Sequence, residues 1–452
     1  MKRNVDALHG SLIPLILTYT FPLILTTIAQ HLFEIVDKAV LGNMADTTAV
    51  AAVGATGTIT SLAINGFVGL ASGTAIVLGR YIGQKNDEKI RTAIDTSLIA
   101  GVGFGVLVAI VGLVASPAFL TLTNCPAACY DGALLYIRIY IAAAPATLLY
   151  NYGATILRTL GDTRRPFTYI MIAGVTNMVL NIILCLILPE KVAAVAIATA
   201  TSQIISAVLV VNRLCHFEDC ARVKLNKLRF SFSAFANLLR FGVPTAVHKL
   251  IFPLANLQIV SAINSFGVDA VAGNSAAASI NTISHAVTDS FGITTLTFMG
   301  QNIGADQPDR TRRSLLYCLL LGVGIGGTTG LLLHLTGEFW LGLIIGFSST
   351  SAIEYGLVRS FWVTQFIFIS GVNAVFSHAL QAYGYPFFSS INSIVFTLGF
   401  RIVWMQGLYP QNPTFPMIML CFTVSWTLIM IFNTVSVIIL THRYQKGAYK
   451  KI

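Results

Sequence analysis

Hydrophobic stretches of roughly 20 to 30 residues follow one another along almost the whole chain, and short polar segments separate them. A helix needs about 20 apolar residues to cross the hydrocarbon core of a bilayer. The pattern therefore predicts an all-α polytopic membrane protein with twelve transmembrane helices and no sizeable soluble domain. The predicted spans lie near residues 12–36, 48–78, 92–115, 131–157, 166–188, 192–213, 238–264, 271–300, 313–336, 353–381, 386–408 and 415–441.

Several prolines fall inside these stretches, among them Pro22, Pro145 and Pro244. Each removes a backbone donor, and the resulting bend either opens a cavity lined by protein or is an ordinary kink. Both interpretations stay open at this point.

Composition agrees with the hydropathy pattern. Hydrophobic residues make up 55% of the chain, charged residues 10%, and the mean hydropathy is +0.76. A soluble domain carries about 25% charged residues. The sequence also has no phosphate-binding Gly-rich loop, no array of metal ligands and no nucleophile elbow. The chain is therefore predicted to be neither an enzyme nor an ATP-driven pump, and to need no organic cofactor.

Basic residues gather on alternate loops and at both ends, which indicates that these segments face the cytoplasm. We expect a multi-pass protein of a bacterial-type plasma (inner) membrane with both termini cytoplasmic. The net charge of +10 then reflects orientation and contact with anionic lipids, and no nucleic-acid partner is needed. The groups are Lys2 and Arg3; Arg80, Lys85, Lys89 and Arg91; Arg158, Arg164 and Arg165; Arg213, Arg222, Lys224, Lys227, Arg229 and Arg240; Arg310, Arg312 and Arg313; and Arg443, Lys446, Lys450 and Lys451.

An internal repeat divides the chain into two halves. Shifting the sequence by 221 residues aligns residues 49–93 with 270–314 without a gap and with ten identities. Six spans per half is an even number, so the halves are predicted to be parallel repeats around a central cleft. The expected division is an N-terminal lobe of residues 1–220, a basic cytoplasmic linker of residues 221–237 and a C-terminal lobe of residues 238–452.

Ordered motifs along the chain resemble those of the multidrug and toxin extrusion (MATE) transporters, which belong to the multidrug/oligosaccharidyl-lipid/polysaccharide flippase superfamily. The resemblance covers essentially the whole chain and implies cation-coupled efflux. Its motifs are Phe33-Glu-Ile-Val-Asp-Lys-Ala-Val-Leu-Gly, Ala49-Val-Ala-Ala-Val-Gly, Ile156-Leu-Arg-Thr-Leu-Gly-Asp-Thr-Arg-Arg-Pro, Ala262-Ile-Asn-Ser-Phe-Gly, Val271-Ala-Gly-Asn and Phe298-Met-Gly-Gln-Asn-Ile-Gly-Ala.

Asp37 is the main candidate for a functional charge, because a carboxylate inside a spanning helix is costly and usually marks an ion or substrate path. Glu34 lies three residues earlier on the same helix face and is a candidate for the substrate or proton path. Alternatively, both side chains simply reach the outer interface, where Lys38 neutralises them.

The resemblance implies that Asn177, Asn181 and Thr199 form a polar cluster with Asp37 that holds a proton or a sodium ion. Many relatives resemble an Asn-x-x-x-Asp pattern, whereas this chain has Asn181 at the second position. One charge fewer predicts weaker sodium binding and favours protons as the coupling ion. The alternative is that the two Asn side chains only link helices.

A second candidate pair lies in span 8, where His285 and Asp289 are four residues apart on one helix face. A histidine beside a carboxylate can exchange a proton near neutral pH, although a purely structural pair is also compatible with this spacing. Another branch of the family carries a glutamate eight residues after the span-7 proline, but here that position is Phe252. His248, Lys249, His378 and Arg401 are interpreted mainly as interhelical contacts.

Together these features predict a secondary antiporter that exports organic cations or drugs against protons or sodium by alternating access. We expect small-molecule substrates, membrane lipids as the only other partners, a monomer, and no metal beyond a sodium ion at the cluster. Two alternatives stay open. A flippase for lipid-linked substrates would need a more cationic cavity, and a membrane sensor or scaffold would not need buried carboxylates.

Overall fold

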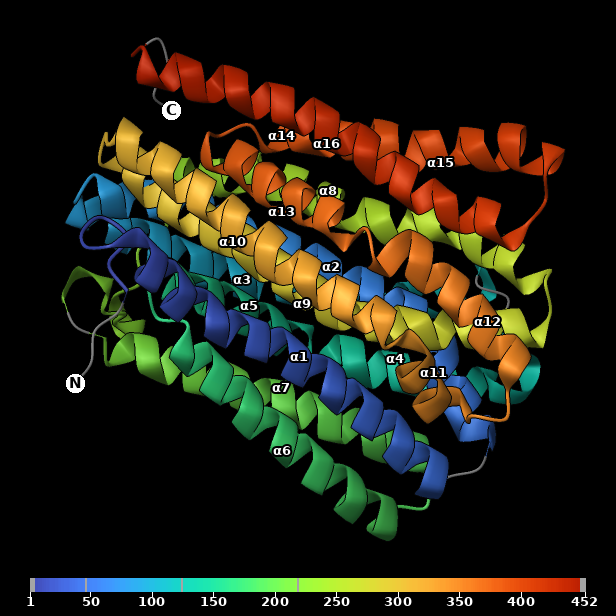
Figure 1. The fold of residues 1–452 in the computed structure, drawn as a ribbon. Helices are drawn as coiled ribbons and strands as arrows, with labels where there is room; N and C mark the ends of the chain where they lie inside the picture. Colours follow the sequence, from blue (N-terminus) through green and yellow to red (C-terminus); the bar gives the residue numbers. More distant parts are fainter. Residues whose placement is uncertain (1–4, 45–46, 123–124, 218, 448–452) are drawn as a thin grey trace. The chain divides into compact units, whose positions relative to one another are not determined.

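The computed structural model describes residues 5–44, 47–122, 125–217 and 219–447, and every regular element in these ranges is helical. Lys2, Arg3, Lys450, Lys451 and the side chains of Glu34 and Lys38 lie outside the described residues. The helices, shown in Figure 1, are α1 (Leu12–Met44), α2 (Thr47–Gly83), α3 (Asp87–Leu122), α4 (Tyr130–Ala142), α5 (Ala144–Thr159), α6 (Arg164–Ile187), α7 (Lys191–Cys215), α8 (Phe232–Asn264), α9 (Val268–Gly304), α10 (Pro308–Leu335), α11 (Gly337–Ile345), α12 (Thr350–Arg359), α13 (Ile367–Ala382), α14 (Pro386–Ser393), α15 (Phe400–Val403) and α16 (Phe415–Gln445).

Each predicted span corresponds to one helix or to two or more consecutive helical segments. In the described part of the chain, nine helices are long and apolar enough to cross a membrane, or eleven spans if two bent pairs are each counted as one. The remaining predicted span, span 8, is α9, which is 37 residues long but rich in Ser, Thr and Asn. The prediction of an all-α multi-pass protein is therefore confirmed.

The two bent spans differ in their cause. The bend of 46° between α4 and α5 lies beside Pro145, which stands in the first turn of α5 and cannot continue the hydrogen-bond ladder of α4. The bend of 41° between α12 and α13 follows the wider π-helical turn η4 (Ser360–Thr364). A proline pattern predicts the first bend, whereas no residue type marks the second.

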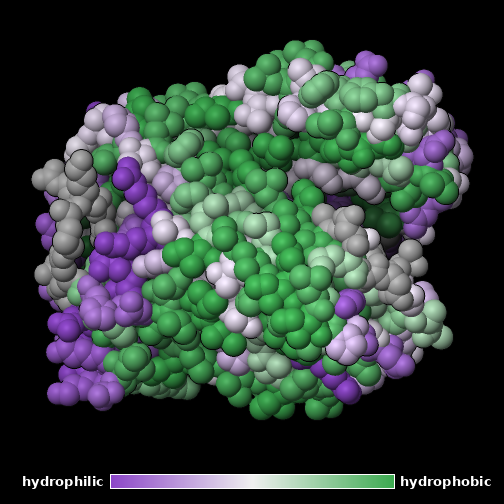
Figure 2. Space-filling view, turned by 90° about the horizontal axis from the view of Figure 1, so that it is seen from below, coloured by the Kyte–Doolittle hydropathy of each residue, from purple (hydrophilic) through white to green (hydrophobic). Residues whose placement is uncertain are grey.

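Large hydrophobic side chains are exposed along the helices, which is the surface that lipid would cover. Leu186, Ile187 and Leu335 keep 70%, 71% and 70% of their surface, and Val114 keeps 79%. Figure 2 shows hydrophobic residues over the middle of one face and hydrophilic residues gathered at its ends. This distribution fits a band of hydrocarbon around the helices.

The chain forms two compact units, one of residues 1–5 and 21–246, the other of residues 6–20 and 247–452. The first helix of each half, α1 and α8, therefore contributes residues to both units. The changeovers lie next to Pro22 in α1 and Pro244 in α8. The hydropathy pattern gives no sign of this exchange.

The exchanged segments are held by close contacts. In the unit that contains residues 6–20, Thr20 Oγ1 lies 2.8 Å from Thr294 Oγ1, and the Tyr19 ring meets the Phe298 ring edge-on at 5.5 Å. In the other unit, the first part of α8 packs on α2, where a Cβ added at Gly73 would lie 2.7 Å from the backbone nitrogen of Gly242. Glycine at this position lets the two helix backbones approach closely.

Candidate functional site

Four residues singled out from the sequence come together in the N-terminal unit: Asp37 on α1, Asn177 and Asn181 on α6, and Thr199 on α7. We call them the Asp37 cluster. The short connection between α6 and α7 makes these helices antiparallel neighbours, and α1 reaches them because Gly174 on α6 leaves room for the Phe33 ring. A Cβ at Gly174 would overlap that ring.

The cluster is bonded directly to its carboxylate. Asn181 Nδ2 donates to Asp37 Oδ1 at 2.7 Å, and Asn181 and Asn177 keep 0% and 4% of their surface. Thr199 Oγ1 donates to the Val195 carbonyl at 2.9 Å, one turn earlier on α7. The carboxylate thus lies against amide groups that are shielded from solvent.

Two orientations of the Asn177 amide complete these hydrogen bonds in different ways, because amide nitrogen and oxygen are assigned from their partners. With the nitrogen toward Asp37, it lies 2.5 Å from Oδ1 and 3.3 Å from Oδ2, while the amide oxygen accepts from the Thr199 backbone N–H at 3.2 Å. With the oxygen toward Asp37, it accepts from Asn181 Nδ2 at 3.2 Å, and the nitrogen donates to Thr199 Oγ1 at 3.4 Å.

The cluster also contains an acceptor that the described residues leave unsatisfied. Asn181 Oδ1 is buried and has no hydrogen-bond partner in the part of the chain that the structure describes. A buried carbonyl oxygen without a partner is uncommon and points to a bound water or cation. Within the same described ranges, no group of three or more His, Cys, Asp or Glu side chains could hold a metal ion.

The second predicted pair is arranged differently. Asp289 Oδ2 lies 3.9 Å from Lys249 Nζ, and the Asp289 side chain keeps 52% of its surface. The His285 ring meets the Trp426 ring edge-on at 5.8 Å. No hydrogen bond joins His285 to Asp289, both of which the structure describes. The recorded charge partner of Asp289 is therefore Lys249 on α8.

Of two further histidines in the C-terminal unit, His248 links two helices and His378 bonds within its own helix. His248 Nδ1 on α8 lies 2.8 Å from Ser393 Oγ on α14. His378 Nδ1 donates to the Ala374 carbonyl at 2.8 Å within α13. The bond of His248 agrees with the interpretation of these residues as interhelical contacts, whereas the bond of His378 lies within α13.

The partners of two arginines, partly buried Arg359 and fully buried Arg401, were not predicted from the sequence. Arg359 Nη1 on α12 donates to Asn274 Oδ1 on α9 at 2.6 Å. Arg401 Nη1 on α15 donates to Asn256 Oδ1 on α8 at 2.8 Å. Applying the repeat offset of 221 to Asp37 would have pointed to within one turn of Asn256, so the repeat held a usable signal.

A multi-pass helical fold of two repeated halves, with a carboxylate inside a span that accepts a hydrogen bond from a buried amide, is typical of membrane transport proteins. The MatE family model matches residues 22–186 and 244–405, once in each half of the chain. The chain therefore belongs to the MATE family, whose members are transporters and not enzymes.

Relatives among characterised proteins match most of the chain. The probable multidrug resistance protein YoeA of Bacillus subtilis is 26% identical over 393 residues, which cover 85% of this chain and 84% of the relative. The FAD transporter of Shewanella oneidensis is 25% identical over 332 residues, 71% of each chain.

Solved structures share the fold at low sequence identity. A MATE protein crystallised in complex with MaL6 superposes with a TM-score of 0.91 at 19% identity and covers 99% of this chain and 100% of its own. A MOP superfamily transporter from Pyrococcus furiosus, described as having a binding pocket of reverse polarity, has a TM-score of 0.85 at 21% identity, with coverage of 100% and 99%.

Proposed function

We propose that the chain is a secondary active exporter of lipophilic organic cations and drugs, driven by proton entry and working by alternating access. The observation that carries this proposal is the hydrogen bond from buried Asn181 to Asp37 inside a membrane span. A carboxylate in a membrane span has a high energetic cost, and such residues usually mark an ion or substrate path. The names of the related multidrug resistance proteins support the same substrate class.

We infer proton coupling from the hydrogen bonds of the Asp37 carboxyl group. Asn181 donates to it, and the Asn177 amide lies against it and also reaches Thr199 on α7. A charged carboxylate only accepts hydrogen bonds, whereas a protonated carboxyl also donates one, so protonation would require the neighbouring amides to change their hydrogen bonds. We propose that this change passes proton binding at Asp37 on α1 to α6 and α7.

Protons suit the cluster better than sodium does. A bare cation needs several oxygen ligands, and its affinity depends on how many of them are charged. The described cluster has one carboxylate, and Asn181 turns its nitrogen toward it, so only Asn181 Oδ1 remains as an uncommitted amide oxygen. We therefore propose protons as the coupling ion, with sodium as the alternative outcome of the test.

The proposed setting is the plasma membrane of a bacterium, with both termini in the cytoplasm and the protein acting as a monomer. The alternating basic loops support this orientation. It predicts that a fluorescent protein fused to either terminus is protected from added protease in intact spheroplasts.

A second substrate class, molecules with an anionic group, is favoured by one observation. In the C-terminal unit, the described spans carry Lys249, Arg359 and Arg401; Lys249 lies 3.9 Å from the Asp289 carboxylate, whereas the two arginines are bonded to asparagine side chains. A related chain is named an FAD transporter. Competition between ethidium and FAD for transport distinguishes the two classes.

The central test uses everted membrane vesicles that contain the full chain and ethidium as the fluorescent cation. A proton gradient and a sodium gradient are imposed in turn. We expect uptake with the proton gradient, collapse of uptake on addition of a protonophore, and no stimulation by sodium. Uptake that is driven by sodium alone overturns proton coupling, and no gradient-driven uptake of ethidium or FAD overturns the proposed export function.

Asp37→Asn is the variant that tests the role of Asp37, because it removes the ionisable group with almost no change in shape. We expect normal expression and insertion but loss of gradient-driven transport. Asp37→Glu keeps the acid and should retain part of the activity. Gradient-driven transport by Asp37→Asn at the wild-type rate refutes the assignment of Asp37.

A further inference from the structure

The three spans that build the Asp37 cluster have counterparts in the second half of the chain. Spans 1, 5 and 6 are α1, α6 and α7, and the corresponding spans 7, 11 and 12 are α8, the run from α14 to α15, and α16. These counterparts also meet at a polar cluster, formed by Asn256, Arg401 and Ser425. We call it the Arg401 cluster.

The two clusters lie at matching depths along their helices. Asp37 and Asn256 each stand about two turns before the ends of α1 and α8. Asn181 stands about two turns before the end of α6, and Arg401 about three turns before the end of its helical run at Gln411. Thr199 and Ser425 each follow the start of their helix by two to three turns.

The arginine fills the centre of its cluster. Its Nη1 donates to Asn256 Oδ1 at 2.8 Å, and Nε and Nη2 each donate to Ser425 Oγ at 3.3 Å. Its Cζ lies 4.4 Å from the centre of the Phe422 ring and 5.4 Å from that of Phe252. The side chain keeps only 1% of its surface.

Arg401 therefore carries a permanent positive charge in a site that is shielded from solvent. A guanidinium does not lose its proton in proteins, and no ion pair joins Arg401 to a carboxylate within the described residues. Its direct partners are instead an amide oxygen, a hydroxyl oxygen and two ring faces, which are groups that coordinate a cation. A second guanidinium, that of Arg359, lies 5.4 Å from the centre of the same Phe422 ring and donates to Asn274. The direct partners of Arg401 are what a bound monovalent cation would need.

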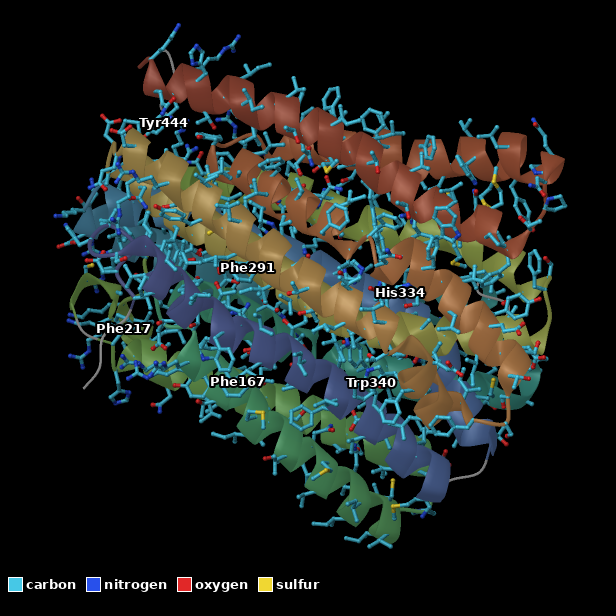
Figure 3. All side chains as sticks on the ribbon, in the orientation of Figure 1. Phe167, Phe217, Phe291, His334, Trp340 and Tyr444 are labelled. Atoms are coloured by element: carbon cyan, nitrogen blue, oxygen red, sulfur yellow. The ribbon has the colours of Figure 1, made fainter. Side chains whose placement is uncertain are left out.

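The backbone around this arginine is also unusual. The four residues of α15 lie between the π-helical turns η5 (Ile394–Gly399) and η6 (Trp404–Leu408). The third π-helical turn in the described ranges, η4, follows Arg359, and its Ser360 Oγ lies 3.2 Å from Nδ1 of His334, labelled in Figure 3. Such turns often mark functional positions, and here they aim a bulky side chain inward.

We propose that the Arg401 guanidinium is a covalently attached cation that occupies, in the C-terminal unit, a cation site equivalent to the Asp37 cluster. The C-terminal site thus binds a small monovalent cation, guanidinium best of all, once the side chain is removed. The comparison rests on the proposed role of Asp37, but occupancy of the C-terminal site is measured without it. On this proposal, the coupling of proton entry to transport is confined to the Asp37 cluster of the N-terminal unit.

The test removes the side chain and supplies its head group from solution. Purified Arg401→Ala in detergent is heated in about 10 mM guanidinium chloride or the same concentration of choline chloride. We expect a lowered unfolding midpoint that guanidinium raises by about 2 °C or more, with no response from the wild type. Trp404→Ala is the control, because it opens an apolar space one turn away.

An equal rise for Trp404→Ala, or no rise for Arg401→Ala, overturns the proposal. If Arg401→Ala does not fold, Arg401→Lys and Arg401→Gln decide the question, because both fill space and only lysine keeps the charge. Lysine should retain a higher unfolding midpoint than glutamine, and equal midpoints overturn the proposal. Transport by Asp37→Asn would refute coupling through Asp37 and leave this measurement unaffected.

Discussion

The Asp37 cluster and the Arg401 cluster lie on corresponding spans of the two halves, but they hold charge in opposite ways. Asp37 is an acid that accepts a hydrogen bond from the Asn181 amide, and we propose that it exchanges a proton there. Arg401 keeps its charge and is fastened by an amide oxygen, a hydroxyl and two aromatic rings. If both proposals hold, the comparison teaches that duplicated halves can diverge into one site with an exchangeable charge and one with a fixed charge.

The largest effect is expected from making the N-terminal cluster resemble the C-terminal one. In Asn181→Arg the guanidinium would pair with Asp37 and occupy the space of the exchangeable proton. Gradient-driven ethidium transport should fall to the level of empty vesicles, while the unfolding midpoint stays near that of the wild type. Asn181→Gln is the neutral control and should retain transport. Active, gradient-driven Asn181→Arg would break the comparison.

The next change makes the C-terminal cluster resemble the N-terminal one. The double variant Asn256→Asp with Arg401→Gln places an unpaired acid in a buried site, where burial favours the neutral form. Its stability should therefore be highest at low pH and fall as the pH rises and the carboxyl ionises. Thermal unfolding between pH 5 and pH 8 measures this slope. The single variant Asn256→Asp keeps the arginine partner, and a similar slope there would contradict the prediction.

A smaller effect is expected from adding charge to the N-terminal cluster itself. Asn181→Asp supplies a second carboxylate oxygen pair beside Asp37, so sodium should bind about tenfold more tightly, or by about 1.4 kcal/mol. Sodium-dependent unfolding and transport report this gain. If the wild type already shows tight sodium stimulation that Asn181→Asp does not raise, the proton-based account of this cluster is wrong.

The smallest effect concerns span 8. If His285 and Asp289 handled protons together, His285→Gln would shift or flatten the pH dependence of transport. Because Asp289 lies beside Lys249 and His285 packs on Trp426, we expect His285→Gln to change the profile little and Lys249→Gln to change it more. Transport rates between pH 6 and pH 8 test this order. A larger change in His285→Gln would restore the histidine–aspartate pair.

Much of the fold could be predicted from the sequence, because hydropathy and the length of a span are local properties. The same holds for the bend at Pro145, which one residue causes. The Asp37 cluster was predicted through the family resemblance, and the structure brings its four residues into contact. Their role in coupling stays a prediction that transport assays must test.

The Arg401 cluster could not be predicted in the same way. Arg401 and Asn256 are 145 residues apart, and their contact depends on how α15 is rotated by the π-helical turns on either side. No residue type specifies such turns. The choice of Lys249 over His285 as the partner of Asp289 likewise depends on the packing of α8 against α9 and not on spacing along one helix.

Residues 6–20 belong to the same unit as residues 247–452, and this affects the order in which the parts of the protein assemble during synthesis. Thr20 meets Thr294, a residue 274 positions later, and Asn302 and Arg310 both donate to the Ala7 carbonyl. At a synthesis rate of about 5–20 residues per second, residues 7–20 wait about 14–61 s for these partners, which lie 274 to 303 positions later. During that interval their polar groups depend on lipid headgroups or on the insertion machinery. A ribosome that stalls in the second half would leave residues 6–20 unassembled, although the residues of the N-terminal unit have all been made.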